Sequence, residues 1–161
     1  MKKLLVLVPI LALAFCLVGC NSEPVKTDKD YYNEYINLES TQAFLNDMNT
    51  AYNDCMDASD ADDVTKAKEA QAKVKEIADM VEANEDVPEV CKDLNKYAKR
   101  ACENLVDSSN HLVASCEAEQ NGDLETMLQE TQLAVQTNNL ASQDVQAFNK
   151  EHEDLKLKYE D

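Results

Sequence analysis

The stretch PEVCKDLNKYAKRACENLVDSSNHLVASCEAEQNGD, residues 88–123, decides the fold. Apolar and small side chains recur in it every three or four residues, which is the period of a helix that buries one face. The proline suits a first helical turn, Asn121-Gly122 is a helix stop, and Asp123 is a natural N-cap for the next helix. We therefore predict a helix from Pro88 to about Gln120. Its apolar stripe comprises Cys91, Leu94, Ala98, Ala101, Leu105, Leu112 and Cys116.

The flanking sequence repeats this helical pattern three times. Residues 30–57 carry apolar side chains at seven-residue intervals, residues 63–83 carry them at three-four spacing, and residues from 124 onward form a fourth amphipathic stretch. Residues 58–62 are the turn that separates the first two helices, with Asp60 or Asp62 as the N-cap of the second. Two poor helix formers adjoin at Asn138-Asn139, and they predict fraying or a bend there.

Together these segments predict an all-α fold. The whole chain has two glycines and three prolines, fewer than strand-and-turn folds need. Four amphipathic helices with short turns pack as an antiparallel bundle, and the short second helix leaves three long helices with an incomplete fourth as a variant. An extended coiled-coil hairpin is the alternative fold. The predicted organisation is a signal peptide over 1–19, a tether over 20–29 and a three- to four-helix bundle over 30–161.

The first twenty residues have the layout of a secretory signal. Lys2 and Lys3 precede an apolar run from Leu4 to Val18 that is too short to span a membrane comfortably. The end of this run and the next two residues, Leu17-Val18-Gly19-Cys20, resemble the lipobox of bacterial lipoproteins. The resemblance implies that Cys20 carries the lipid and becomes the mature N-terminus. We therefore expect an extracytoplasmic protein anchored in the cell membrane, or in the outer membrane of a diderm organism.

The net charge of −17 restricts the partners. Cleavage before Cys20 would remove two lysines and no acid, which makes the mature chain more negative still. Nucleic acid needs a basic surface and is excluded as a partner, and anionic lipid headgroups would repel the body of the protein. Cations and basic envelope or extracellular proteins remain, while the alternative is that the charge only secures solubility.

Four cysteines remain after the signal and the lipid site are set aside. Three of them, Cys91, Cys102 and Cys116, lie on one predicted helix and are too far apart along it to bond with each other. Cys55 and Cys116 each precede the end of a helix, and in an antiparallel bundle these two ends lie at the same level. If a disulfide forms, we expect it between Cys55 and Cys116.

Acidic residues concentrate at the end of the bundle that the anchor places farthest from the membrane. N-capping accounts for some of them, but negative charge in the last turn of a helix is unfavourable. A divalent cation or a basic partner would offset that cost. The predicted surface comprises Asp54, Asp57, Asp60, Asp62, Asp63, Glu117, Glu119 and Asp123.

No sequence motif points to catalysis. Both histidines, His111 and His152, lie inside predicted helices, and the chain has no nucleophile elbow, phosphate loop, haem motif or paired metal-ligand spacing. We therefore expect a non-catalytic interaction protein without a cofactor. A low-affinity divalent-cation module and a structural spacer are the alternatives.

Overall fold

The computed structural model describes residues 25–160. The signal peptide, the lipid site at Cys20 and the first half of the tether, residues 20–24, lie outside these residues. Between 25 and 160 every regular element is helical, which confirms the predicted all-α fold. The elements are α2 (Asp28–Ile36), α3 (Glu39–Asn46), α4 (Met48–Asp60), α5 (Val64–Glu82), the 3₁₀ turn η1 (Glu89–Cys91), α6 (Lys92–Gln120) and α7 (Leu124–Glu160).

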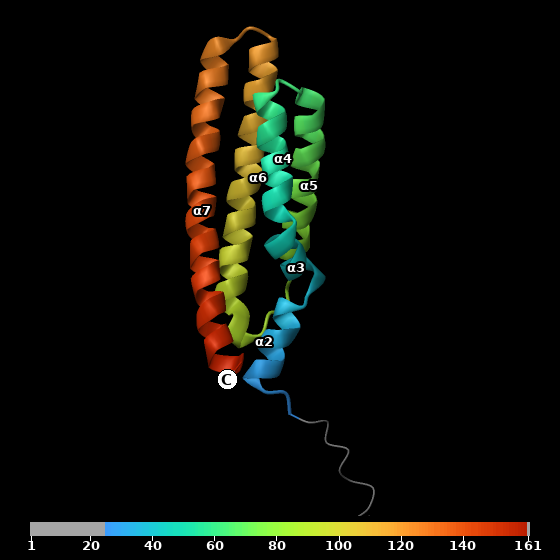
Figure 1. Ribbon diagram of the computed structural model, residues 1–161, viewed down its shortest axis with the longest axis vertical. Coiled ribbons are helices and arrows are strands. Elements are labelled where there is room, and N and C mark those ends of the chain that lie inside the picture. Colours follow the sequence, from blue (N-terminus) through green and yellow to red (C-terminus); the bar gives the residue numbers. More distant parts are fainter. Residues whose placement is uncertain (1–24, 161) are drawn as a thin grey trace, which may run out of the picture.

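The helices form an elongated antiparallel bundle (Figure 1). Helices α4, α5 and α6 pack against one another, whereas α7 packs chiefly along α6. The short α2 lies beside the C-terminal part of α7, and α3 connects α2 to α4 (Figure 1). The central core is apolar, and its fully buried side chains include Tyr35, Met48, Val74, Leu94 and Phe148.

The first predicted helix, residues 30–57, is not continuous. The chain leaves the helical conformation at Leu38, with φ −60° and ψ 139°, and it bends again at Asp47. Side-chain amides satisfy carbonyl oxygens at the first break: Asn37 donates to the Asn33 carbonyl at 2.8 Å, and Gln42 donates to the Ile36 carbonyl at 2.7 Å. These local bonds make the break inexpensive, because they replace backbone bonds that the helix loses.

The last predicted helix is continuous over its whole length. Helix α7 runs without interruption through Asn138-Asn139, so the predicted fraying there is wrong. Ala134 and Ala141 on either side are buried, and the Thr137 hydroxyl donates to the Leu133 carbonyl at 2.9 Å. Tertiary packing along α6 therefore outweighs the low helix propensity of the two asparagines.

Small and polar residues form the contact between α6 and α7. Ser108 is fully buried, and its hydroxyl donates to the Ala134 carbonyl at 2.8 Å and pairs with the Tyr52 hydroxyl at 2.6 Å. The bonds link α4, α6 and α7 in one chain of contacts. About two helical turns further along α6, the Ser115 hydroxyl donates to the Met127 carbonyl of α7 at 3.2 Å. Helix α7 is thus positioned by specific hydrogen bonds in addition to apolar burial.

Candidate functional site

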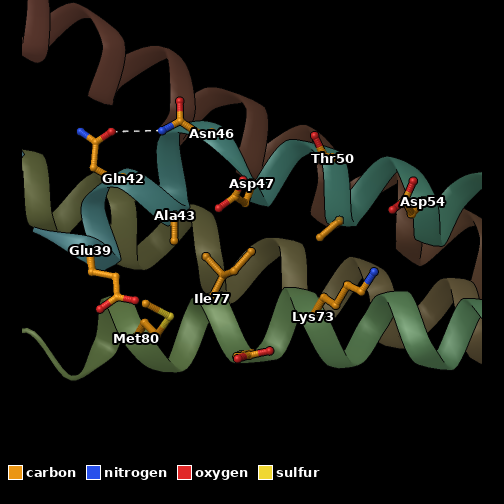
Figure 2. Close-up of a pocket in the computed structure, with 12 residues that line it drawn as sticks. Glu39, Gln42, Ala43, Asn46, Asp47, Thr50, Asp54, Lys73, Ile77 and Met80 are labelled. Carbon is orange, nitrogen blue, oxygen red and sulfur yellow. Dashed lines mark hydrogen bonds between the residues drawn. The ribbon is translucent and has the colours of Figure 1, made fainter.

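A groove of about 660 Å³ runs between α3 and α4 on one side and α5 on the other (Figure 2). The bend at Asp47 helps to shape it, since residues of α3 and α4 line the same wall. Its apolar lining comes from buried Ala43, Ala51 and Ile77 and from half-buried Met80. Such a lining can cover the apolar face of another molecule, and a flexible methionine adapts to its shape.

The exposed rim of this groove is predominantly acidic. Glu39, Asp47, Asp54 and Glu76 line it together with one basic residue, Lys73. In Figure 2 the acidic side chains come from both walls, so the negative charge lies on both sides of the apolar lining. An opening lined by one sign of charge concentrates ligands of the opposite sign.

The groove adjoins a second hollow, of about 370 Å³, toward the α4–α5 turn, and the two share Asp54 and Lys73. Asp57, Asp63 and Glu69 add acidic side chains to it, and Lys66 adds a basic one. Asp63 also caps α5 and forms a salt bridge with Lys66 at 3.0 Å. We call the two hollows together the acidic groove. It includes three of the residues predicted from the sequence as a partner surface, Asp54, Asp57 and Asp63.

The remaining predicted acidic residues have other roles. Glu117 pairs with Lys68 of α5 at 2.5 Å, so a lysine of the same chain offsets a charge that we expected a cation or partner to offset. Asp123 caps α7, where its carboxylate accepts from the Thr126 backbone amide at 3.1 Å. Asp60 is exposed in the last turn of α4.

Asp62 and Glu119 meet across the two turns at the far end of the bundle. The proximity of Asp62 raises the pKa of Glu119, through a hydrogen bond and through charge repulsion. The Gln120 side chain also donates to the Asp62 carbonyl at 2.8 Å. Asp62 has φ +54° and Gly122, in the equivalent turn, has φ +73°, so the left-handed conformation ends both helices. The predicted juxtaposition of the two turns is therefore present.

Substituting Asp62→Asn is expected to raise the thermal unfolding midpoint at neutral pH. The folded-state pKa of Glu119 lies above its unfolded value, so the pair of charges destabilises the fold above that pKa, and the cost disappears as pH falls through it. The difference between variant and wild type should therefore shrink in acid. Asparagine tolerates the left-handed conformation as aspartate does. A variant midpoint below that of the wild type at neutral pH would contradict this account.

Side chains that could coordinate a metal ion do not come together into a metal site in the part of the chain that the structure describes. Within residues 25–160, no three or more histidine, cysteine, aspartate or glutamate side chains are grouped so that they could hold a metal ion. His111 instead pairs with Glu130 at 2.6 Å, and His152 pairs with the Tyr32 hydroxyl at 3.2 Å.

Cys55 and Cys116, the pair expected if a disulfide forms, are both buried free thiols in the structure. The Cys55 thiol is directed to the Ala67 carbonyl of α5 at 3.6 Å. Burial is the main cause that raises the pKa of Cys55 to about 11, and Cys116 contributes further. Burial also raises the pKa of Cys91 to about 11 and that of Cys102 to about 12, which makes these thiols poor nucleophiles at neutral pH.

Sequence reasoning missed a second surface, on α7. Between residues 126 and 149 only Glu130 and Asp144 are charged, although 29% of the whole chain is charged. Both turn toward α6, where Glu130 binds His111 at 2.6 Å and Asp144 binds Arg100 at 3.1 Å. Every exposed side chain between 126 and 149 is uncharged. The low density of charge is visible in the sequence, but the inward direction of the two carboxylates is not.

Comparison of the chain with protein-family models, with curated proteins and with solved structures finds no match. None of the helices between residues 25 and 160 is both long and apolar enough to traverse a membrane.

Proposed function

We propose that this protein is a lipoprotein of the cell envelope, anchored through Cys20, that acts as a non-catalytic interaction module for a basic partner. The observation that carries the proposal is the acidic groove, in which acidic side chains border an apolar lining. A patch of charge alone would serve solubility. The combination of a hollow, an apolar lining and a predominantly acidic rim suits an amphipathic partner whose lysines or arginines flank an apolar face.

The direction of the bundle agrees with this role. Helix α2 is the first described helix after Cys20 in the sequence, and the residues that line the acidic groove extend from Glu39 of α3 to Asp63 beside the α4–α5 turn. An anchor at Cys20 would place the groove along the side of a rod that stands on the membrane. Repulsion between this acidic body and anionic headgroups would help to hold the groove away from the lipid surface.

The proposal is tested by removing charge from the groove without changing its shape. The variant Asp47→Asn, Asp54→Asn, Glu76→Gln alters three exposed rim residues, and Asp47 makes no side-chain hydrogen bond as the N-cap of α4. The matched control, Asp79→Asn, Glu103→Gln, Asp107→Asn, makes the same change of charge in a hollow between α5 and α6. The probe is a short synthetic peptide whose lysines and leucines alternate at helical spacing.

We expect the wild type and the control variant to bind the peptide in a titration at low salt, and the groove variant to bind roughly tenfold more weakly, since each exposed charge pair contributes about 0.2–1 kcal/mol. Binding to the wild type should weaken as salt is added. Equal binding by both variants would show that net charge alone attracts the peptide. In intact cells, crosslinking of the same three proteins should join a basic partner to the wild type and the control only.

The two alternatives make different predictions for this experiment. If the protein is a spacer without a ligand, crosslinking in cells should capture no partner that depends on the groove residues. A cation module would bind calcium at the acidic end and lose the peptide in competition with calcium, beyond the effect of sodium chloride at matched ionic strength. The cation alternative has less support, because among residues 25–160 no group of three or more metal-coordinating side chains could hold an ion.

A further inference from the structure

Helix α7 carries a stripe of uncharged side chains that no other helix between residues 25 and 160 covers. The stripe contains Leu128, Val135, Ser142 and Asn149 at seven-residue spacing, with Gln132, Asn139 and Gln146 between them. All seven side chains are exposed, Leu128 to 64% and Val135 to 56%, and Leu124 extends the stripe toward the far turn with 63% exposure. We call this set, from Leu124 to Asn149, the α7 stripe. Its alternating three-four spacing is that of a helix that packs lengthwise on another helix.

The stripe leads into a groove between α7 and α4. This groove has a volume of about 360 Å³, and α7 contributes Ser142, Gln146 and Asn149 of the stripe to its wall. Phe44, Met48, Tyr52, Leu105 and Val145 provide its apolar lining. None of the residues that line it is charged, in contrast to the acidic groove on the other side of α4.

The net charge of the chain indicates which molecule binds this surface. Two molecules of net charge −17 repel each other along any face that exposes carboxylates. Helices α4, α5 and α6 all expose charged side chains, whereas α7 exposes none between Glu125 and Lys150. The α7 stripe is therefore the face along which two copies can approach with the least repulsion. It is also self-complementary, because leucine, valine and amide side chains pair with their own kind.

We propose that the α7 stripe is the contact surface for a second copy of this chain, with the α7 helices of the two copies side by side over the α4–α7 groove. Copies anchored in one membrane stand in the same direction, so the two helices run parallel and in register around a two-fold axis. This parallel arrangement rests on the proposed anchor at Cys20. The self-association does not, and it is independent of the partner proposed for the acidic groove.

Cysteine crosslinking of the full-length chain in intact cells tests the contact. In a parallel, in-register pair Leu128 faces Leu128 and Val135 faces Val135, so Leu128→Cys and Val135→Cys should each give a disulfide-linked band at twice the monomer mass after mild oxidation. The matched control is Leu140→Cys, which is 49% exposed on the same helix but lies on another side of it. The wild type under the same oxidation reports any crosslinking by the native cysteines.

A homodimer band for both stripe variants, absent from Leu140→Cys and from the wild type, supports the proposal. Reaction at Val135 but not at Leu128 would indicate antiparallel helices and overturn the parallel arrangement. An adduct of another mass would show that a different protein covers the stripe, and the absence of any band would show that nothing does; both overturn self-association. As a second measurement, Val135→Glu should abolish crosslinking at Leu128→Cys, while Leu140→Glu should leave it unchanged.

Discussion

The Phe148→Ala variant is expected to lose about 3–5 kcal/mol of unfolding free energy, because it removes a large, fully buried aromatic side chain. Phe148 packs edge-on against Phe44 of α3, with ring centroids 5.1 Å apart and planes inclined by 65°. It also stacks near His152, at 6.1 Å between centroids. Aromatic pairs of this kind contribute about 0.5–1.5 kcal/mol beyond the burial of their surface.

The loss should weaken one particular connection, since Phe148 packs α7 against α3. Chemical denaturation of the wild type and the variant measures the change. Leu157→Ala is the control, because Leu157 is on the same helix but 68% exposed, and its truncation should change stability by no more than about 0.5 kcal/mol. If Phe148→Ala were as stable as Leu157→Ala, α7 would not pack on α3 as described.

The Arg100→Met variant is expected to lose about 1–3 kcal/mol, because it leaves a carboxylate buried without its cation. Asp144 is only 4% exposed, and its carboxylate binds the Arg100 guanidinium at 3.1 Å and accepts from the Asn104 amide at 3.2 Å. The guanidinium is half-exposed and the bond to Asn104 remains, so the loss should be smaller than for a fully buried pair.

A second substitution separates the buried charge from simple loss of packing. Asp144→Asn in the Arg100→Met background removes the uncompensated charge and keeps an amide beside Asn104. Equilibrium denaturation should therefore show the double variant to be more stable than Arg100→Met alone. If the double variant is equally unstable or less stable, the aliphatic part of Arg100 contributes more than its charge does.

The spacing of apolar residues correctly predicted the helices that have no break. The pattern over residues 88–120 corresponds to η1 and α6, and that over 63–83 corresponds to α5 within one residue at each end. The breaks at Leu38 and Asp47 were missed because no glycine or proline marks them. They depend on side-chain bonds such as that from Gln42 to the Ile36 carbonyl, which the spacing of apolar residues does not encode.

The candidate site was only partly visible for the same reason. Asp54, Asp57 and Asp63 were predicted from their position near the end of a helix, and they do line one hollow. Glu39 and Asp47 join the acidic groove because the first helix bends, so an unbroken helix gives no reason to select them. The α7 stripe depends on two carboxylates turning inward, and that depends on Arg100 and His111 of α6.

The position of the first and last described helices has a further consequence. Tyr32 of α2 lies 5.7 Å from Tyr159 near the end of α7, measured between ring centroids, so the polypeptide enters and leaves the bundle at the same end. The opposite end consists of two tight turns, at Asp62 and Gly122. Sequence that precedes α2 or follows α7 is therefore joined to the bundle at this end. The opposite tip keeps its composition when such flanking sequence changes.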